Sequence, residues 1–171
     1  SLAFALSHAA KHGMKRVIYV IPYTSIIEQN AQVFREILGN ENVLENHSNV
    51  DYEISEDFKP MQLAAENWDK PVVVTTNVQF FESLHSNKRS KLRKLHNMAD
   101  SMLVFDEVHL MPIKFFQPCL ESIVYLTQYC NSEALFLTAT MPDFEKVIAN
   151  YMGKGVQIEN LVTDKSQFDL F

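Results

Sequence analysis

Short apolar runs alternate with longer stretches of helical periodicity along most of this chain, and this alternation constrains the fold most strongly. Buried parallel strands are continuous apolar runs, and the connections between parallel strands are usually helices. The pattern therefore predicts an α/β fold, a parallel sheet with helices on both faces. The expected strands are Arg16–Ile21, Val43–Leu44, Pro71–Thr75, Leu103–Phe105, Ala134–Leu137 and Val156–Ile158.

The segments between these runs carry their own signals for helix boundaries. Gly13 is suited to end a first helix, and Ser25 and Glu28 have the spacing of a capping box at the start of a second. Asn77 is a candidate N-cap for a third helix. Residues 49–60 are polar and are expected to form a loop. The expected helices cover residues 2–12, 26–38, 61–68, 78–84 and 115–129, and one more follows Pro142.

Length and composition indicate one globular domain, because 171 residues with 47% hydrophobic and 21% charged side chains can bury a sizeable core. We expect this domain over residues 1–158 and a tail or linker over residues 159–171. The net charge of −6 excludes a protein that is basic overall, although a local basic patch would still attract nucleic acid. Two cysteines, Cys119 and Cys130, favour reduced thiols inside a cell. Apolar runs fall short of the roughly 18–20 residues that a membrane span needs, so no membrane partner is expected.

Two adjacent carboxylates, Asp106 and Glu107, follow the apolar run at residues 103–105, and His109 lies two residues further on. Open α/β sheets bind ligands in the crevice outside the carboxyl ends of their strands. Paired acids there suit Mg²⁺–nucleotide chemistry, because one can hold the cation through water and the other can orient or deprotonate an attacking water. An acid pair that merely caps a turn is the alternative, and the pair alone does not decide between the two.

Polar or small residues also end three other predicted strands. They form the segments Pro22–Ser25, Thr75–Asn77 and Thr138–Thr140. Parallel strands would bring all of them to the sheet edge that carries the acids. Hydroxyls and backbone NH groups at helix starts are natural ligands for phosphate. We therefore expect this edge to bind nucleotide phosphates beside the acids and nucleic-acid phosphates further along.

In their order along the chain, these segments resemble the first RecA-like domain of superfamily 2 helicases. Asp106–His109 is similar to the DExH, or Walker B, box of that family, and Thr138–Thr140 to its Ser/Thr-Ala-Thr motif. The resemblance implies ATP and Mg²⁺ as cofactors, with Asp106 holding Mg²⁺ through water and Glu107 activating the hydrolytic water. It implies that nucleotide state is coupled to strand movement by His109, Thr138, Ala139 and Thr140. It also implies contacts to single-stranded DNA from Pro22, Thr24, Ser25, Thr76 and Asn77.

Longer strings narrow the resemblance to the CRISPR-associated helicase–nuclease of type I systems. These strings are Pro22–Asn30, Asn46–Ser48, Trp68–Thr76 and Gln79–Leu84. The resemblance implies an ATP-dependent helicase of the prokaryotic cytoplasm that unwinds target DNA for degradation in antiviral defence. Its implied partners are single-stranded DNA, a CRISPR surveillance complex, and an HD nuclease present as a fused domain or a separate subunit.

One departure from the family pattern is the lack of a Gly-rich phosphate loop with its Lys and Ser/Thr anywhere in the sequence. In the family this loop immediately precedes a helix like that expected at residues 2–12, so we expect a domain that is incomplete at its N-terminus. The chain alone is accordingly expected to hydrolyse little or no ATP. Two alternatives stay open: another superfamily 2 ATPase, such as an RNA helicase or a restriction motor, and a non-hydrolysing interaction module.

Basic and aromatic groups elsewhere have simpler structural explanations. The run from Lys88 to Lys94 could meet DNA phosphates, but a solvated helix face is the favoured interpretation. The pairs Phe80–Phe81 and Phe115–Phe116 could stack on bases, but their apolar surroundings predict that they belong to the core.

Overall fold

A five-stranded parallel sheet forms the centre of the computed structural model, which describes residues 1–47, 67–86, 89–111, 115–138, 159 and 161. The sheet has the order β2-β3-β1-β4-β5, and every neighbouring pair is parallel. Its strands are β1 (Arg16–Ile21), β2 (Val43–Asn46), β3 (Val72–Thr76), β4 (Ser101–Phe105) and β5 (Glu133–Phe136). The first five predicted strands are thus confirmed, and the candidate at residues 156–158 lies outside the described part of the chain.

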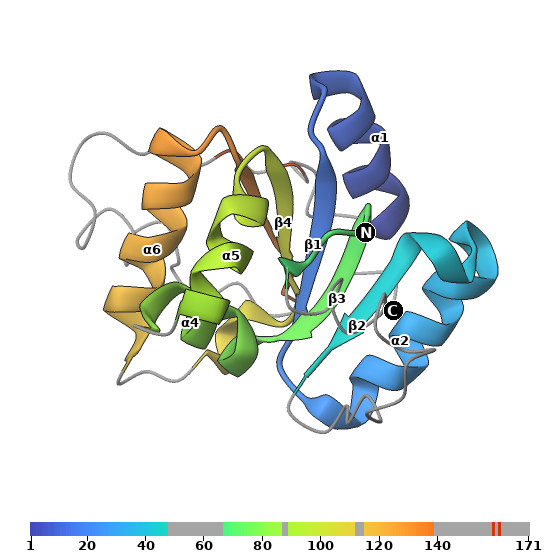
Figure 1. Ribbon diagram of the computed structural model, residues 1–171, viewed down its shortest axis with the longest axis horizontal. Helices are drawn as coiled ribbons and strands as arrows, with labels where there is room; N and C mark the ends of the chain where they lie inside the picture. The colour runs from blue at the N-terminus through green and yellow to red at the C-terminus, as the bar shows by residue number, and fades with distance from the viewer. Residues whose placement is uncertain (48–66, 87–88, 112–114, 139–158, 160, 162–171) are drawn as a thin grey trace, which may run out of the picture.

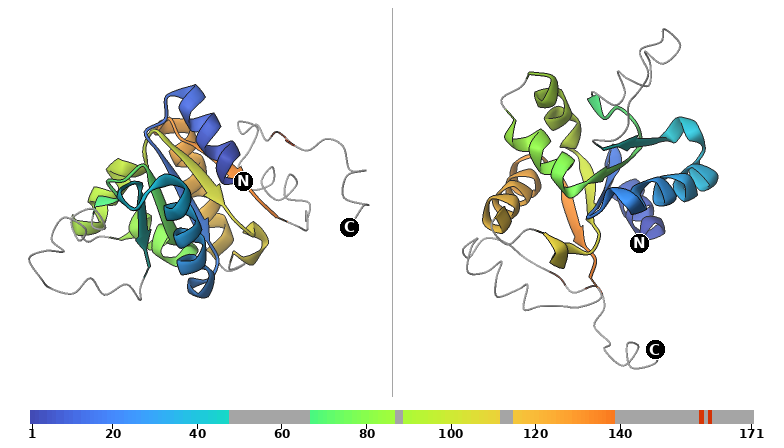
Figure 2. Two further views of the ribbon diagram at one scale, coloured as in Figure 1. Left: turned by 90° about the vertical axis from the view of Figure 1, so that its right-hand side faces the viewer. Right: turned by 90° about the horizontal axis from the view of Figure 1, so that it is seen from below.

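Helices cover both faces of this sheet, as the sequence pattern predicts (Figures 1 and 2). One face carries α1 (Leu2–His12) and α2 (Thr24–Leu38). The other face carries α4 (Asn77–His85), α5 (Arg89–Met98) and α6 (Phe116–Tyr129). Two short 3-10 helices, η1 (Asn40–Asn42) and η3 (Val108–Leu110), precede β2 and follow β4. Among the described helices, none combines the length and apolarity that crossing a bilayer requires.

Several expectations fall on parts of the chain that the structure does not describe. They are the loop at residues 49–60, most of the helix at residues 61–68, the helix after Pro142, and nearly all of the tail at residues 159–171. The domain boundary at residue 158 therefore stays a prediction.

Alternate residues of the central strand β1 separate the interior into two apolar layers. Ile18 and Val20 pack against the layer under α4, α5 and α6, whereas Tyr19 points into the layer under α1 and α2. Phe105 at the end of β4 is fully buried, and its ring contacts that of Phe80 at 5.3 Å between centroids. Because β1 is buried along its whole length, the end of this strand and of its neighbours is held by packing on both faces.

Two of the predicted helix caps are wrong by one or two residues. Helix α2 begins at Thr24 with Tyr23 as its extended N-cap residue, so Ser25 lies inside the first turn and makes no capping bond. Helix α4 is capped by Thr76, whose Oγ1 accepts a hydrogen bond of 3.1 Å from the Gln79 amide. Asn77 is already helical there. In both places the extended residue that serves as the N-cap lies one or two positions before the polar residue predicted from the sequence.

Two side chains differ in exposure from the prediction. Phe80 and Phe81 are core residues as expected, but Phe115 precedes α6 and is 62% exposed. Lys94 is buried although it belongs to the basic run, so a solvated helix face does not describe this residue. Its ammonium lies 5.1 Å from the centroid of the Trp68 ring, a cation–π arrangement that a pattern of charges does not reveal.

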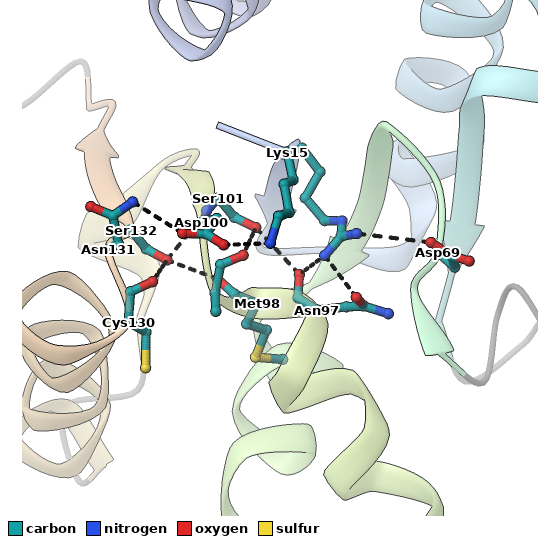
Figure 3. A network of polar contacts seen from close by, with 11 residues as sticks. Lys15, Asp69, Asn97, Met98, Asp100, Ser101, Cys130, Asn131 and Ser132 are labelled. Atoms are coloured by element: carbon teal, nitrogen blue, oxygen red, sulfur yellow. Dashed lines mark hydrogen bonds and ion pairs between the residues drawn. The ribbon is translucent and has the colours of Figure 1, made fainter. Parts of the chain in front are cut away.

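A polar network ties together the amino-terminal ends of the strands, on the side opposite the acids (Figure 3). Lys15 donates from Nζ to Oδ2 of Asp100 at 2.6 Å, and Asn131 donates to Oδ1 of the same carboxylate at 3.0 Å. Arg16 donates to both the main-chain and side-chain oxygens of Asn97. The hydrogen bonds from Lys15 and then Asn131 lower the pKa of Asp100 below its ordinary value of 3.8.

Replacing Asp100 with asparagine should make the free energy of unfolding less sensitive to acid. Because the pKa is lower in the folded state, the carboxylate stabilises the fold above its ordinary pKa, and this contribution is lost as the pH falls through the folded value. Asparagine tolerates the left-handed backbone of Asp100, φ 53°. Urea unfolding at about pH 7 and about pH 3 should show a smaller loss in the variant than in the wild type or in a Glu36→Gln control. An equal acid loss in all three proteins would contradict the assignment.

Candidate active site at the carboxyl edge of the sheet

The strand register brings the predicted polar segments to one edge. Ile21 at the end of β1 is the Cα partner of Thr76 at the end of β3. Phe105 at the end of β4 is the partner of Val20 on one side and of Phe136 in β5 on the other. The segments after these residues therefore leave the sheet at nearly the same level, as expected for ligand-binding loops of an open parallel sheet.

Asp106 is held firmly at the end of β4. Its amide donates to the Val20 carbonyl at 2.9 Å, which extends the pairing with β1 by one residue. Its Oδ1 accepts a 3.1 Å hydrogen bond from the Glu107 amide, and its Oδ2 accepts a 3.3 Å hydrogen bond from the Tyr19 hydroxyl. The carboxylate thus has a fixed orientation before any ligand arrives.

Tyr19 is a site residue that the sequence does not reveal, because it stands inside an apolar strand. Burial raises the pKa of the Tyr19 hydroxyl, a hydrogen bond with Ser1 lowers it, and the Asp106 carboxylate raises it again. Burial is the largest of these effects, so the phenol stays protonated and can donate to Asp106. Tyr19 therefore acts as a donor that orients the first acid.

Glu107 turns away from the strand with a left-handed backbone, φ 47°, at the start of η3. Its Oε2 is buried and accepts no hydrogen bond from the described residues, although it lies 3.2 Å from Nδ1 of His109. The same His109 nitrogen lies 3.1 Å from Oγ1 of Thr138. The structure therefore joins the second acid, the histidine and the end of β5 into one short chain of contacts.

The backbone supports this chain of contacts. The Leu137 amide donates to the Phe105 carbonyl at 2.9 Å, and the Val108 amide donates to the Leu137 carbonyl at 3.2 Å. The segments after β4 and β5 are consequently bonded to each other beyond the last strand residues. Ala139 and Thr140, the other two predicted coupling residues, lie outside the described part of the chain.

The other half of the edge contains the residues expected to contact nucleic acid. Pro22 follows β1, and Thr24 and Ser25 form the first turn of α2, where Ser25 is exposed. Thr76 ends β3 and Asn77 begins α4, and both are buried. Asn77 keeps a buried Oδ1 that has no hydrogen-bond partner among the described residues. The register of β1 and β3 sets these two segments next to each other.

A polar cluster at the end of β2 carries no signal in the sequence. Oδ1 of Asn46 accepts hydrogen bonds from the Trp68 indole at 3.0 Å and from the Lys94 ammonium at 2.9 Å. The Asn46 carbonyl accepts a 2.8 Å hydrogen bond from the Thr75 hydroxyl. These contacts fix the end of β2 beside the edge that holds Thr76. Residues from four separate segments meet here, so spacing along the chain does not predict the cluster.

Comparisons with known proteins identify the fold and the family. A solved structure, DUF1998 helicase MrfA bound to DNA and AMPPNP, has the same fold, with a TM-score of 0.54 at 14% identity over 88% of this chain and 21% of that chain. The CRISPR-associated nuclease/helicase Cas3 of Haloferax volcanii is 28% identical over 149 residues, 74% of this chain and 15% of that protein. The chain thus spans about a fifth or less of these relatives. The DEAD/DEAH box helicase family matches residues 1–147, most of the sequence, and the chain therefore belongs to that family.

Proposed function

We propose that this chain is part of the first motor domain of an ATP-dependent helicase that moves on single-stranded DNA in CRISPR antiviral defence. The observation that carries the proposal is the joined set of Asp106, Glu107, His109 and Thr138 at the carboxyl edge of the sheet. Such a set suits a motor because it links a pair of acids to a second strand end. Family membership supports a helicase, and the similarity to Cas3 supports the CRISPR role.

The two acids suit a magnesium ion bound with a nucleotide. Asp106 offers an oriented carboxylate and Glu107 a buried oxygen that lacks a hydrogen bond within the described residues. Carboxylate oxygens are the ligands that Mg²⁺ prefers. We assign Asp106 to hold the ion through water, and the ion, when bound with ATP, neutralises the charge on the phosphates. Glu107 is assigned to orient and deprotonate the attacking water.

Phosphate binding requires groups beyond those of this sequence, because it lacks a Gly-rich phosphate loop. We therefore expect little or no ATP hydrolysis from these 171 residues alone and assign the activity to the full-length protein. A non-hydrolysing interaction module is the competing function. The acid pair with its supporting Tyr19 hydroxyl favours the motor, since an interaction module has no need of an oriented carboxylate.

Removing the His109–Thr138 contact should uncouple ATP hydrolysis from DNA. In the full-length protein, Thr138→Ala deletes the hydroxyl that lies 3.1 Å from His109 but leaves both acids in place. We expect basal ATP turnover to change by no more than about tenfold, because a neutral hydrogen bond contributes only about 0.5–1.5 kcal/mol. Strand separation per ATP should fall much further. Thr127→Ala, on the remote helix α6, is the matched control, and equal losses of turnover and unwinding would contradict the coupling role.

Contacts to the DNA backbone are assigned to Ser25 and Asn77, together with Pro22, Thr24 and Thr76. Ser25→Ala with Asn77→Ala removes an exposed hydroxyl and a side-chain amide NH2 group, both of which can donate to phosphate oxygens. The Oδ1 of Asn77 has no hydrogen-bond partner among the described residues, so its loss breaks no described hydrogen bond at that atom. Fluorescence anisotropy should show roughly tenfold weaker binding of single-stranded DNA, about 1.4 kcal/mol, as expected for one or two hydrogen bonds to phosphates. Gln32→Ala on α2 should leave binding unchanged. Unaltered affinity in the double variant would remove these residues from the DNA site.

The proposed partners are a CRISPR surveillance complex and an HD nuclease, fused or separate. A plasmid-interference assay in cells tests this directly, with a target plasmid that the guide RNA matches and one that it does not match. Loss of interference in a Glu107→Gln strain supports the role. Normal interference in that strain would favour another superfamily 2 ATPase, such as an RNA helicase or a restriction motor.

A further inference from the structure

Two histidines and a glutamate meet at the edge of the sheet opposite the acid pair. His8 and His12 lie one helical turn apart on α1, and their rings are stacked with centroids 4.2 Å apart. Glu133 begins β5, and its Oε2 lies 2.7 Å from Nε2 of His8. One ligand atom from each of the three side chains lies within 4.8 Å of the others. Residues 125 positions apart in sequence therefore converge at one point on the surface.

The backbone on both sides of this cluster is fixed by the network in Figure 3. The Lys15 amide, just after α1, donates to the Asp100 carbonyl at 2.7 Å, and the Asp100 amide donates to the Cys130 carbonyl at 2.9 Å. Asn131, two residues before Glu133, donates to the Asp100 carboxylate. The end of α1 and the start of β5 are thus held against the same residue. This arrangement restricts the motion of the cluster before anything binds to it.

We propose that His8, His12 and Glu133 bind a divalent transition-metal ion of the zinc class. Two imidazoles and one carboxylate form a ligand set that zinc uses with water in the fourth position. A histidine pair at i and i+4 presents both rings on one face of a helix, and the third ligand comes from a separate strand. The ion would take the place of the direct contact between Nε2 of His8 and Oε2 of Glu133.

A second group of possible ligands, Glu28, Glu45 and His47, fits a cation less well. The Arg35 guanidinium lies 2.8 Å from Oε2 of Glu45, so a cation there would face a fixed positive charge. No cationic side chain is paired with His8, His12 or Glu133 in the contacts of the described residues. The site on α1 is therefore the better candidate.

A metal ion at this position would act as a clamp between α1 and the edge strand β5. The site lies at the amino-terminal ends of the strands, whereas the proposed catalytic acids lie at the carboxyl ends. It has no part in the proposed ATP chemistry and does not depend on it. Binding of the ion to the folded state alone would raise the melting temperature, because ligands that bind only the folded state stabilise it.

Zinc titration of the purified full-length protein tests the proposal. Isothermal calorimetry and thermal melts should give one Zn²⁺ per chain at this site and a higher melting temperature, and Co²⁺ should give the visible spectrum of tetrahedral coordination. His12→Gln and Glu133→Gln change exposed side chains, so both variants should fold, and each should weaken zinc binding about tenfold or more. His96→Gln on α5 replaces an exposed histidine outside the cluster and should bind zinc as the wild type does.

The metal-free melting temperature of each variant separates folding from binding. If His12→Gln and Glu133→Gln melt like the wild type without metal and lose the zinc-induced shift, the site is confirmed. Zinc affinity that is unchanged in both variants, or lost equally in His96→Gln, would overturn the proposal. A wild type without a zinc response would also overturn it and would show that His8 and Glu133 make only their direct 2.7 Å contact.

Discussion

Replacing Glu107 with glutamine in the full-length protein should lower ATP turnover about 10²–10⁴-fold, the usual contribution of a positioned general base. Glutamine keeps the size of the side chain but removes the basic oxygen. In the structure this oxygen accepts no hydrogen bond from the described residues and lies 3.2 Å from Nδ1 of His109. Nucleotide affinity should change little, because Asp106 and its hydrogen bond from Tyr19 stay in place.

Phosphate release gives the turnover of this variant, and a fluorescent ATP analogue gives its affinity. Glu121→Gln on α6 is the matched control, since it makes the same chemical change at an exposed glutamate that is not part of the acid pair. Turnover in Glu107→Gln that equals that of the control would contradict the assignment of the base. Weak nucleotide binding with normal turnover at saturation would instead assign Glu107 to binding.

Replacing Phe80 with alanine should lower the free energy of unfolding by about 3–5 kcal/mol, as expected when a large buried aromatic side chain is lost. Phe80 is fully buried, and its ring contacts those of Trp68, Phe81 and Phe105 at 6.2, 5.1 and 5.3 Å between centroids. These neighbours come from separate segments, so the cavity cannot close by the movement of one side chain.

Urea unfolding followed by circular dichroism measures this loss. Phe115→Ala makes the same substitution at a ring that is 62% exposed, and it should cost less than about 1 kcal/mol. A similar loss in the two variants would show that the layer under α4, α5 and α6 does not form a cooperative core.

The sheet could be predicted from the sequence because its strands are buried on both faces. Arg16–Ile21 is apolar along nearly all its length, and all six residues are buried. Both faces of this strand meet apolar layers, so the strand can be recognised without deciding which face points into the core. The alignment of strand ends followed from the parallel arrangement, which in turn followed from helical connections. The position of Asp106 and Glu107 at the edge was therefore predictable from the amino-acid pattern alone.

Contacts between distant segments were not predictable in the same way. Tyr19 has the sequence context of a core residue, and only the packing of β1 against β4 brings its hydroxyl to Asp106. Lys94 has the sequence context of a solvated charge, but the fold places it over Trp68. The caps at Ser25 and Asn77 failed for a local reason, because residue type fixes a helix boundary only to within one or two positions.

The most direct test of the motor function measures ATP hydrolysis by the full-length protein with no nucleic acid, with single-stranded DNA, and with RNA of the same sequence. We predict that DNA stimulates hydrolysis, that RNA has a much smaller effect, and that Glu107→Gln removes the stimulated rate. Stimulation by RNA alone would contradict the proposed substrate and favour an RNA helicase. A folded protein without hydrolysis under any of the three conditions would contradict the motor and favour an interaction module.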